Sequence, residues 1–527
     1  MNLGYAKKGH AWRATAAAGA GLWVLAGSLV MACGGEGAES KPAVSAPPPK
    51  PAPSPAPTAD VDPLGPRPEV EAAPAFVPPA PVVFRTANGM NVWLLERHAV
   101  PVVAVDIALP IGSASDPPGE GGLAWATANM LDEGAGSRGA LELARAIDEL
   151  GASLATGASA DHSHASLFVL KRNLTPAFGL LADVVTRPRF DATEWKRVHD
   201  LWMNDLKART REPAAVARVV ASAALYGADQ PYGHPTSGST SSAARVDLAR
   251  IKRFYRANWR PDQATVVAAG DITRAEISAI LEQAFSGWKA PSSAGTDAKA
   301  VPAAKAESGA QHSRLILVDR PDAPQSQILV VRPGPSISDA DATVLSRANI
   351  ALGGSFTSRL NSDLREEHGW TYGAGSRVAS MRQAGTIFFS SAVHTKNTGD
   401  ALKAMQSDID VFSSKGLTPV EVERTRMLSR AELVEQYERV EHTASLLAGD
   451  AALGLPPSYE SDAAVRRDAA TKSDLDRVAQ RWLDAKDAVV VIVGPQSSVL
   501  PQLEALHLPK PELFDAEGNP RAPHAAK

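Results

Sequence analysis

Three histidines are spaced as the ligands of a metal site would be. His162 and His164 alternate along a short polar stretch that begins at Asp161, and alternate residues of a strand project from the same face. His199, in a predicted helix, would bring a third imidazole from another element. Such a set is a known ligand pattern for zinc. The letters ADHSHAS also fit the polar start of an ordinary strand, so the sequence leaves both interpretations open.

The chain has a single cysteine, Cys33, which excludes disulfides and any thiolate-only metal site. Cys33 follows a basic start and an uncharged run over 14–32, and Val30-Met31-Ala32-Cys33 resembles a bacterial lipobox. We expect residues 1–32 to be a lipoprotein signal peptide and Cys33 to be acylated after cleavage. An ordinary signal peptide and a membrane anchor are the alternatives. Gly34 is not the Asp that signals inner-membrane retention, so we expect a cell-envelope lipoprotein on the periplasmic face of the outer membrane.

Composition limits what the rest of the chain does. Of 527 residues, 44% are apolar and 21% charged, with 54 basic and 58 acidic side chains and a net charge of −4. Loss of residues 1–32 removes three basic and no acidic side chains, leaving 51 − 58 = −7. A chain without a basic excess is not expected to bind nucleic acid. Its length predicts two or three domains.

The chain after residue 81 repeats one design. Residues 33–81 read as a Pro/Ala-rich tether, because 15 of the 40 prolines fall within 41–81. Arg97 and Arg320, which end matching strands, are 223 residues apart, and Gly270 and Gly494, which close matching strands, are 224 apart. This offset indicates a duplicated domain. The predicted division is an N-terminal domain over 82–290, a hinge over 291–312, a C-terminal domain over 313–507 and a flexible tail over 508–527.

Within each half, hydrophobic patterning predicts strands and helices without strict alternation, which favours an α+β class over a doubly wound sheet. The opening and closing strands of the halves are predicted at 92–97, 102–107, 264–271, 315–320, 327–331 and 488–494. Further strands are predicted at 152–154, 165–170, 371–380 and 385–394. Helices are predicted at 143–150, 194–208, 243–257, 341–352, 397–414 and 419–451.

The order of these elements and several local phrases resemble the insulinase/pitrilysin family of zinc peptidases, the inverzincins. The phrases are LPIGSASDPPGEGGLA over 109–124, PYGHPTSG over 231–238, FYRANWRPDQATVVAAGDI over 254–272 and ALGGSFTSRLNSDLREEHGWTYGAGS over 351–376. The resemblance covers residues 82–500. It implies two homologous domains, each a mainly antiparallel sheet packed with helices, together forming a clam-like half-shell.

The family's catalytic motif is H-x-x-E-H on a helix, with two zinc-binding imidazoles and a glutamate as general base. The matching positions here are Trp125, Ala128 and Asn129. An indole and a neutral amide do not ligate zinc at such a site, and alanine moves no proton. The family's third ligand, a glutamate on a later helix, falls at Asn204 or Asp205. The resemblance therefore implies a degenerate site that binds no metal.

The resemblance gives the second half a different role. Family members use an Arg and a Tyr seven residues apart, and Arg365 and Tyr372 keep that separation. It implies that Tyr372 donates to the substrate carbonyl or developing oxyanion and that Arg365 orients it. An Arg paired on a helix face and a half-buried Tyr are the structural alternative. The Gly-bearing turn at 352–356 is implied only weakly as a peptide-binding loop, since Gly-Gly also ends helices.

These features predict a non-catalytic subunit of a heteromeric zinc peptidase. Its partner would be a zinc-bearing subunit of the family, with Zn²⁺ held only there, and the substrate would be a peptide. The alternatives are a pseudo-peptidase that binds peptides or acts as an envelope scaffold, and an enzyme with a rewired metal site at His162, His164 and His199.

Overall fold

The computed structural model describes residues 75–290 and 314–521. The signal, Cys33, most of the tether and the hinge over 291–312 lie outside these residues. None of the helices in the described ranges is both long and apolar enough to cross a membrane.

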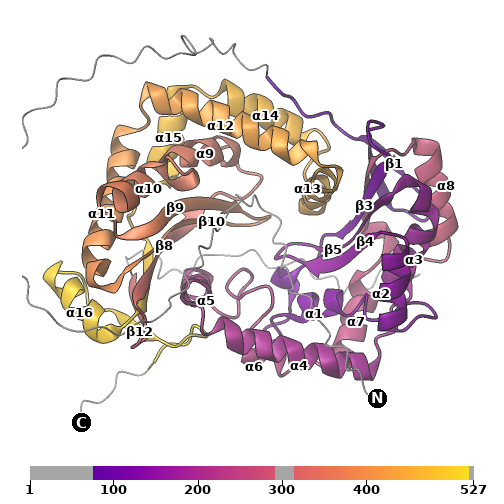
Figure 1. Ribbon diagram of the computed structural model, residues 1–527, viewed down its shortest axis with the longest axis horizontal. Coiled ribbons are helices and arrows are strands. Elements are labelled where there is room, and N and C mark those ends of the chain that lie inside the picture. Colours follow the sequence, from indigo (N-terminus) through magenta and orange to yellow (C-terminus); the bar gives the residue numbers. More distant parts are fainter. Residues whose placement is uncertain (1–74, 291–313, 522–527) are drawn as a thin grey trace, which may run out of the picture. The chain divides into compact units, whose positions relative to one another are not determined.

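The first half is built on a six-stranded sheet (Figure 1). Its strands are β1 (Val82–Arg85), β2 (Asn91–Glu96), β3 (Val102–Leu109), β4 (Ser153–Ala158), β5 (Ser163–Leu170) and β6 (Thr265–Gly270). Its helices are α1 (Leu123–Asn129), α2 (Ala140–Glu149), α3 (Leu174–Thr186), α4 (Ala192–Arg209), α5 (Pro213–Tyr226), α6 (Thr240–Ala243), α7 (Leu248–Asn258) and α8 (Arg274–Phe285).

The second half repeats this plan. Its strands are β7 (Arg314–Asp319), β8 (Gln325–Gly334), β9 (Thr371–Ser380), β10 (Gly385–His394), β11 (Val489–Gly494) and β12 (Glu512–Phe514). Its α-helices are α9 (Ala342–Asn349), α10 (Arg359–Asn361), α11 (Thr398–Lys415), α12 (Pro419–Glu438), α13 (Val440–Leu453), α14 (Tyr459–Ala469), α15 (Lys472–Trp482) and α16 (Gln496–Ala505). Two π-helical turns follow α9 and α10, at Ile350–Gly354 and Ser362–Glu367.

The two sheets have the same strand order, which confirms the predicted duplication. The orders are β1-β2-β6-β3-β5-β4 and β12-β7-β11-β8-β10-β9. In each half the opening strand pairs in parallel with the closing strand, and the remaining pairs inside the repeat are antiparallel. The class is α+β, as predicted. Only the edge strands differ, because β1 pairs antiparallel with β2 whereas β12 pairs parallel with β7.

Each sheet buries one face under helices of its own half and the other face under a helix of the opposite half. Helix α5 of the first half packs on β8 and β11, where Val216 and Val220 meet Val331 and Val491. Helix α13 of the second half packs on β3 and β6 through Ala444. Both sheet faces are therefore dry, and this explains why the closing strands read as unbroken apolar runs.

Several predicted elements need correction. The flexible tail over 508–527 is wrong for Glu512–Phe514, which forms β12 along the edge of the second sheet. The predicted helix over 243–257 begins only at Leu248, as α7, because Asp247 leaves the helical region and caps α7 through the Arg250 N–H; Ala243 is the last residue of α6. The predicted helix over 419–451 breaks at Arg439, whose backbone is extended.

Candidate functional site

Helix α1 carries the three positions that match the family's zinc motif. The Asp116 carboxylate holds the first turn of this helix in place. The two Asp116 carboxylate oxygens accept the backbone N–H groups of Gly122 and Ala124, at 2.7 and 2.8 Å. Gly122 has φ of 97°, and a Cβ there would lie 2.6 Å from the Trp202 ring. This position therefore needs glycine, since any side chain would meet both backbone strain and a buried indole. Burial raises the pKa of Asp116 to about 8, against the effect of the two N–H groups.

The three motif positions form a packed helix face with no chemistry for zinc. Ala128 is fully buried, and Asn129 donates its amide to the Trp125 carbonyl, at 2.7 Å, within its own helix. The Trp125 indole lies against Trp202 of α4, with ring centroids 5.2 Å apart. These residues do not fit a zinc ion, because none of them offers an imidazole or carboxylate at the site.

Helix α4 presents aromatic side chains where a third ligand was expected. Trp202 is buried and donates its indole N–H to the Ser237 carbonyl at 2.9 Å. Asn204 and Asp205 are both exposed. Asn204 lies about 200° around the helix axis from Trp202, and Asp205 lies about 60° from it. Trp202 is the residue of α4 that contacts Trp125.

Of the three histidines of the alternative metal site, His162 and His199 have hydrogen-bond partners, and His164 Nδ1 has none among the described residues. The rings of His162 and His164 do lie on one face, 5.8 Å apart, and His162 Nδ1 contacts Ser159 Oγ at 2.8 Å. Burial lowers the pKa of both histidines, that of His162 to about 4. His199 instead contacts the Ala243 carbonyl at 3.3 Å. Within residues 75–290 and 314–521, no three His, Cys, Asp or Glu side chains are grouped so that they could hold a metal ion.

In the second half, Arg365 and Tyr372 lie on adjoining elements. Arg365 belongs to the π-helical turn Ser362–Glu367, and Tyr372 is the second residue of β9. The chain reverses between them at Gly369, which has φ of 65°, and the Trp370 N–H donates to the Leu364 carbonyl at 3.0 Å. This short reversal fixes how the turn and the strand meet.

Arg365 is braced whereas Tyr372 is open to solvent. The Arg365 guanidinium lies over the Phe356 ring, 4.3 Å from its centroid, and pairs with Glu366 at 3.2 Å. Tyr372 is 82% exposed, and Phe356 is 55% exposed. A tyrosine is an amphipathic side chain that is usually half-covered. The predicted alternative, a half-buried Tyr372, is wrong.

The Gly-bearing turn before Phe356 has a structural reason for its glycines. A Cβ on Gly353 would lie 2.3 Å from the backbone nitrogen of Ser376 in β9. The turn is also tied to that strand by Asn349, which accepts from the Ser376 hydroxyl at 2.6 Å and donates to the Ser376 carbonyl. Phe356 is thus presented beside Arg365 by a backbone that is packed directly on β9.

The hairpin that bears Tyr372 is fixed at its far end by contacts that the sequence analysis missed. Arg382, in the turn between β9 and β10, donates to the carbonyls of Asp161, Ala452 and Pro110 at 2.7, 2.9 and 3.3 Å. Asp161 in turn accepts from the Tyr232 hydroxyl at 2.6 Å. The polar residues around Asp161 therefore help to hold the two halves of the chain together. Nothing in the local sequence of Arg382 indicates this role.

Comparison with known proteins agrees with this architecture. Residues 92–238 match the family model "Insulinase (Peptidase family M16)", and residues 245–428 match "Peptidase M16 inactive domain". An uncharacterized zinc protease of Mycobacterium tuberculosis is 25% identical over 413 residues, which cover 78% of this chain and 92% of the relative.

Two solved structures show the same fold. A peptidase M16 inactive domain from Pseudomonas fluorescens superposes with a TM-score of 0.71 at 24% identity, covering 79% of this chain and 98% of that one. A chain of complex III2 from Candida albicans superposes with a TM-score of 0.66 at 15% identity, covering 81% and 97%.

Proposed function

Because this chain belongs to the insulinase family, peptidase family M16, we propose that it is a non-catalytic subunit of a heteromeric zinc peptidase. Its partner would be a second family member with an intact H-x-x-E-H helix, and that partner would hold the zinc ion. This chain would contribute Arg365 and Tyr372 to a peptide bound at the partner's site.

One contrast carries the proposal. The motif positions Trp125, Ala128 and Asn129 belong to a packed helix face, whereas Tyr372 is 82% exposed beside a braced Arg365. A phenol hydroxyl held in the open can donate to a substrate carbonyl, and a positioned donor of this kind contributes roughly 3 kcal/mol to transition-state stabilisation. The likeness to a chain of complex III2 supports the proposal, since that chain also lies within a larger complex.

The test is to purify the full chain from its native cells and identify the proteins that copurify. The expected result is a family member with an intact motif and a chelator-sensitive peptidase activity of the pair. Tyr372→Phe is expected to lower kcat about 100-fold with the complex intact, as for loss of one oxyanion donor. Tyr437→Phe is the matched control, because the Tyr437 hydroxyl is buried without a hydrogen-bond partner among the described residues.

Two results would contradict the proposal. One is a complex whose activity is indifferent to Tyr372→Phe. The other is a chain that binds peptides without a zinc-bearing partner, which would favour a peptide-binding or scaffolding pseudo-peptidase.

We also propose that the mature chain is attached to the periplasmic face of the outer membrane by acylation of Cys33. The proposal rests on the sequence Val30-Met31-Ala32-Cys33 after a basic, then uncharged, leader. Cys33→Ala is expected to move the chain from the membrane fraction to the soluble fraction. An unchanged membrane fraction would contradict lipid attachment.

A further inference from the structure

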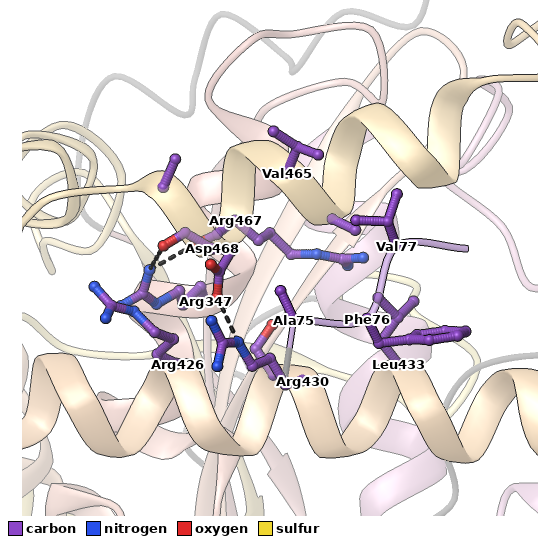
Figure 2. Close-up of a pocket in the computed structure, with 13 residues that line it drawn as sticks. Ala75, Phe76, Val77, Arg347, Arg426, Arg430, Leu433, Val465, Arg467 and Asp468 are labelled. Atoms are coloured by element: carbon purple, nitrogen blue, oxygen red, sulfur yellow. Dashed lines mark hydrogen bonds and ion pairs between the residues drawn. The ribbon is translucent and has the colours of Figure 1, made fainter. Parts of the chain in front are cut away.

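A small cavity lies between α12, α14 and the segment that precedes β1 (Figure 2). Its volume is about 170 Å³. That is several times the roughly 30 Å³ share of a water molecule and well below the pockets of drug-sized ligands. The cavity can therefore take a small group.

Four arginines line this cavity, and one carboxylate faces them. The arginines are Arg347, Arg426, Arg430 and Arg467, and the carboxylate is Asp468, so the lining carries 4 − 1 = +3 charges. Figure 2 shows Arg467 extending toward Val77, while Arg430 turns to Asp468. Clustered guanidinium groups repel one another in a low-dielectric site, so a bound anion would stabilise this part of the chain.

Arg347 is the most deeply buried member of this group. It is 0% exposed, and its Nη atoms donate to the carbonyls of Arg467, Asp468, Ala470 and Val422, at 2.5, 3.4, 3.1 and 2.8 Å. Its Nε–H has no hydrogen-bond partner among the described residues. Burial, and next the charge of Arg426, lower the pKa of Arg347. A bound acceptor group would satisfy this buried donor.

The other arginines are only partly compensated. Arg426 pairs with Glu423 at 3.2 Å, but its buried Nε–H also lacks a partner among the described residues. Arg430 pairs with Asp468 at 2.5 Å, and Arg467 pairs with Glu460 at 3.5 Å. Burial raises the pKa of the Glu460 carboxyl, which weakens its compensation of Arg467.

An apolar segment at the start of the described chain forms another wall of the cavity. Ala75, Phe76 and Val77 line the cavity, and Phe76 packs edge-on against Tyr437 of α12 with ring centroids 5.8 Å apart. Leu433 and Val465 continue this apolar wall. The site thus combines a cationic floor with an apolar wall.

We propose that this cavity binds a phosphate group, either as free phosphate or as a phosphate monoester. Its oxygens would accept the unpaired Nε–H groups of Arg347 and Arg426, and its negative charge would offset the excess of guanidinium groups. This site is independent of the proposed peptidase role and lies apart from Arg365 and Tyr372 in the sequence.

The test is a calorimetric titration of the full chain with inorganic phosphate at constant ionic strength, with thermal unfolding as a second readout. Saturable binding and a saturable rise in Tm are expected. Arg426→Gln is expected to weaken binding roughly ten- to hundredfold, the effect of losing one hydrogen bond to a charged group. The matched control is Arg424→Gln, on the same helix and with the same 34% side-chain exposure, which does not line the cavity and leaves binding unchanged.

A short-chain phosphatidic acid, soluble as a monomer, separates the two sources of phosphate. Tighter binding of this lipid than of inorganic phosphate assigns the cavity to a phosphate monoester, and equal or weaker binding assigns it to free phosphate. The proposal is overturned if neither probe binds saturably, or if Arg426→Gln and Arg424→Gln weaken binding equally. Arg347 is not a useful target, because its removal also strips four backbone carbonyls of a donor.

Discussion

Glu421 holds together the segment that leads to the Arg365 turn, and we expect Glu421→Gln to destabilise the chain in a pH-dependent way. The Glu421 carboxylate accepts two hydrogen bonds from Arg359, both at 2.7 Å, and two from the N-cap residue Thr418. Its burial alone would raise the pKa, but Arg359 and Thr418 outweigh burial and lower the pKa from 4.5 to about 2. The Glu421 side chain is only 10% exposed, so solvent screens this pair weakly.

The depressed pKa gives the sign and size of the effect. The folded state favours the carboxylate, so its stabilisation is fully present above the unfolded pKa and is lost as pH falls toward about 2. A shift of 4.5 to about 2 corresponds to about 3.4 kcal/mol at pH 7. The same arithmetic leaves about 1.4 kcal/mol at pH 3. The difference in stability between the wild-type chain and the Glu421→Gln variant should therefore shrink by about 2 kcal/mol over this range.

Urea unfolding followed by far-ultraviolet circular dichroism measures this difference at a series of pH values. Glu435→Gln, an exposed substitution on the same helix, is the control and should change the free energy of unfolding by less than about 0.5 kcal/mol at every pH. A loss of stability for Glu421→Gln that stays constant with pH would contradict this prediction. That result would mean that the loss comes from packing and not from the charged pair.

Three further predictions follow from the packing of the halves. Arg382→Met should lower the free energy of unfolding by about 3 kcal/mol and speed hydrogen exchange in β9 and β10, because backbone carbonyls between the two halves lose a charged donor. Unchanged hydrogen exchange would contradict the role of Arg382. Trp202→Ala should cost about 3–5 kcal/mol by chemical denaturation, and a loss below about 1 kcal/mol would mean that the motif face is not a packed core. Burial raises the pKa of Asp106 from 3.8 to about 8, so the folded state binds the extra proton and wild-type stability should fall as pH rises between these values. Asp106→Asn should remove this pH dependence of stability and raise the free energy of unfolding by about 4 kcal/mol at pH 7. An unchanged pH dependence in the variant would contradict the prediction.

Much of the fold could be predicted because its signals are local or periodic. The runs at 371–380 and 385–394 match β9 and β10 in their limits, and the nearly equal offsets of Arg97 and Gly270 from their counterparts, 223 and 224 residues, located the duplication. Helix α5 was missed, since its partner is the sheet of the other half and no local pattern indicates such a contact. The strand β12 was missed for a similar reason. Three residues next to prolines form a strand only because the edge of β7 is there to pair with.

The candidate site could likewise be predicted only in part from the sequence. The resemblance to the family assigns the motif positions to Trp125, Ala128 and Asn129, and their residue types imply that they bind no zinc. The orientation of α4 about its own axis could not be predicted, because counting residues along the chain does not show which of them faces a neighbouring helix. In the structure Trp202, and not Asn204, contacts Trp125. The contact between the Arg365 guanidinium and the Phe356 ring could be recognised only in the folded turn.

We propose that this chain has no zinc site of its own and acts through a partner. The most direct measurement is the zinc content of the purified full chain, by elemental analysis after dialysis against metal-free buffer. We expect a value near zero per chain, because Trp125, Ala128 and Asn129 offer no ligand set. A stoichiometric zinc ion would contradict it, and substitution of His162, His164 and His199 would then locate the site.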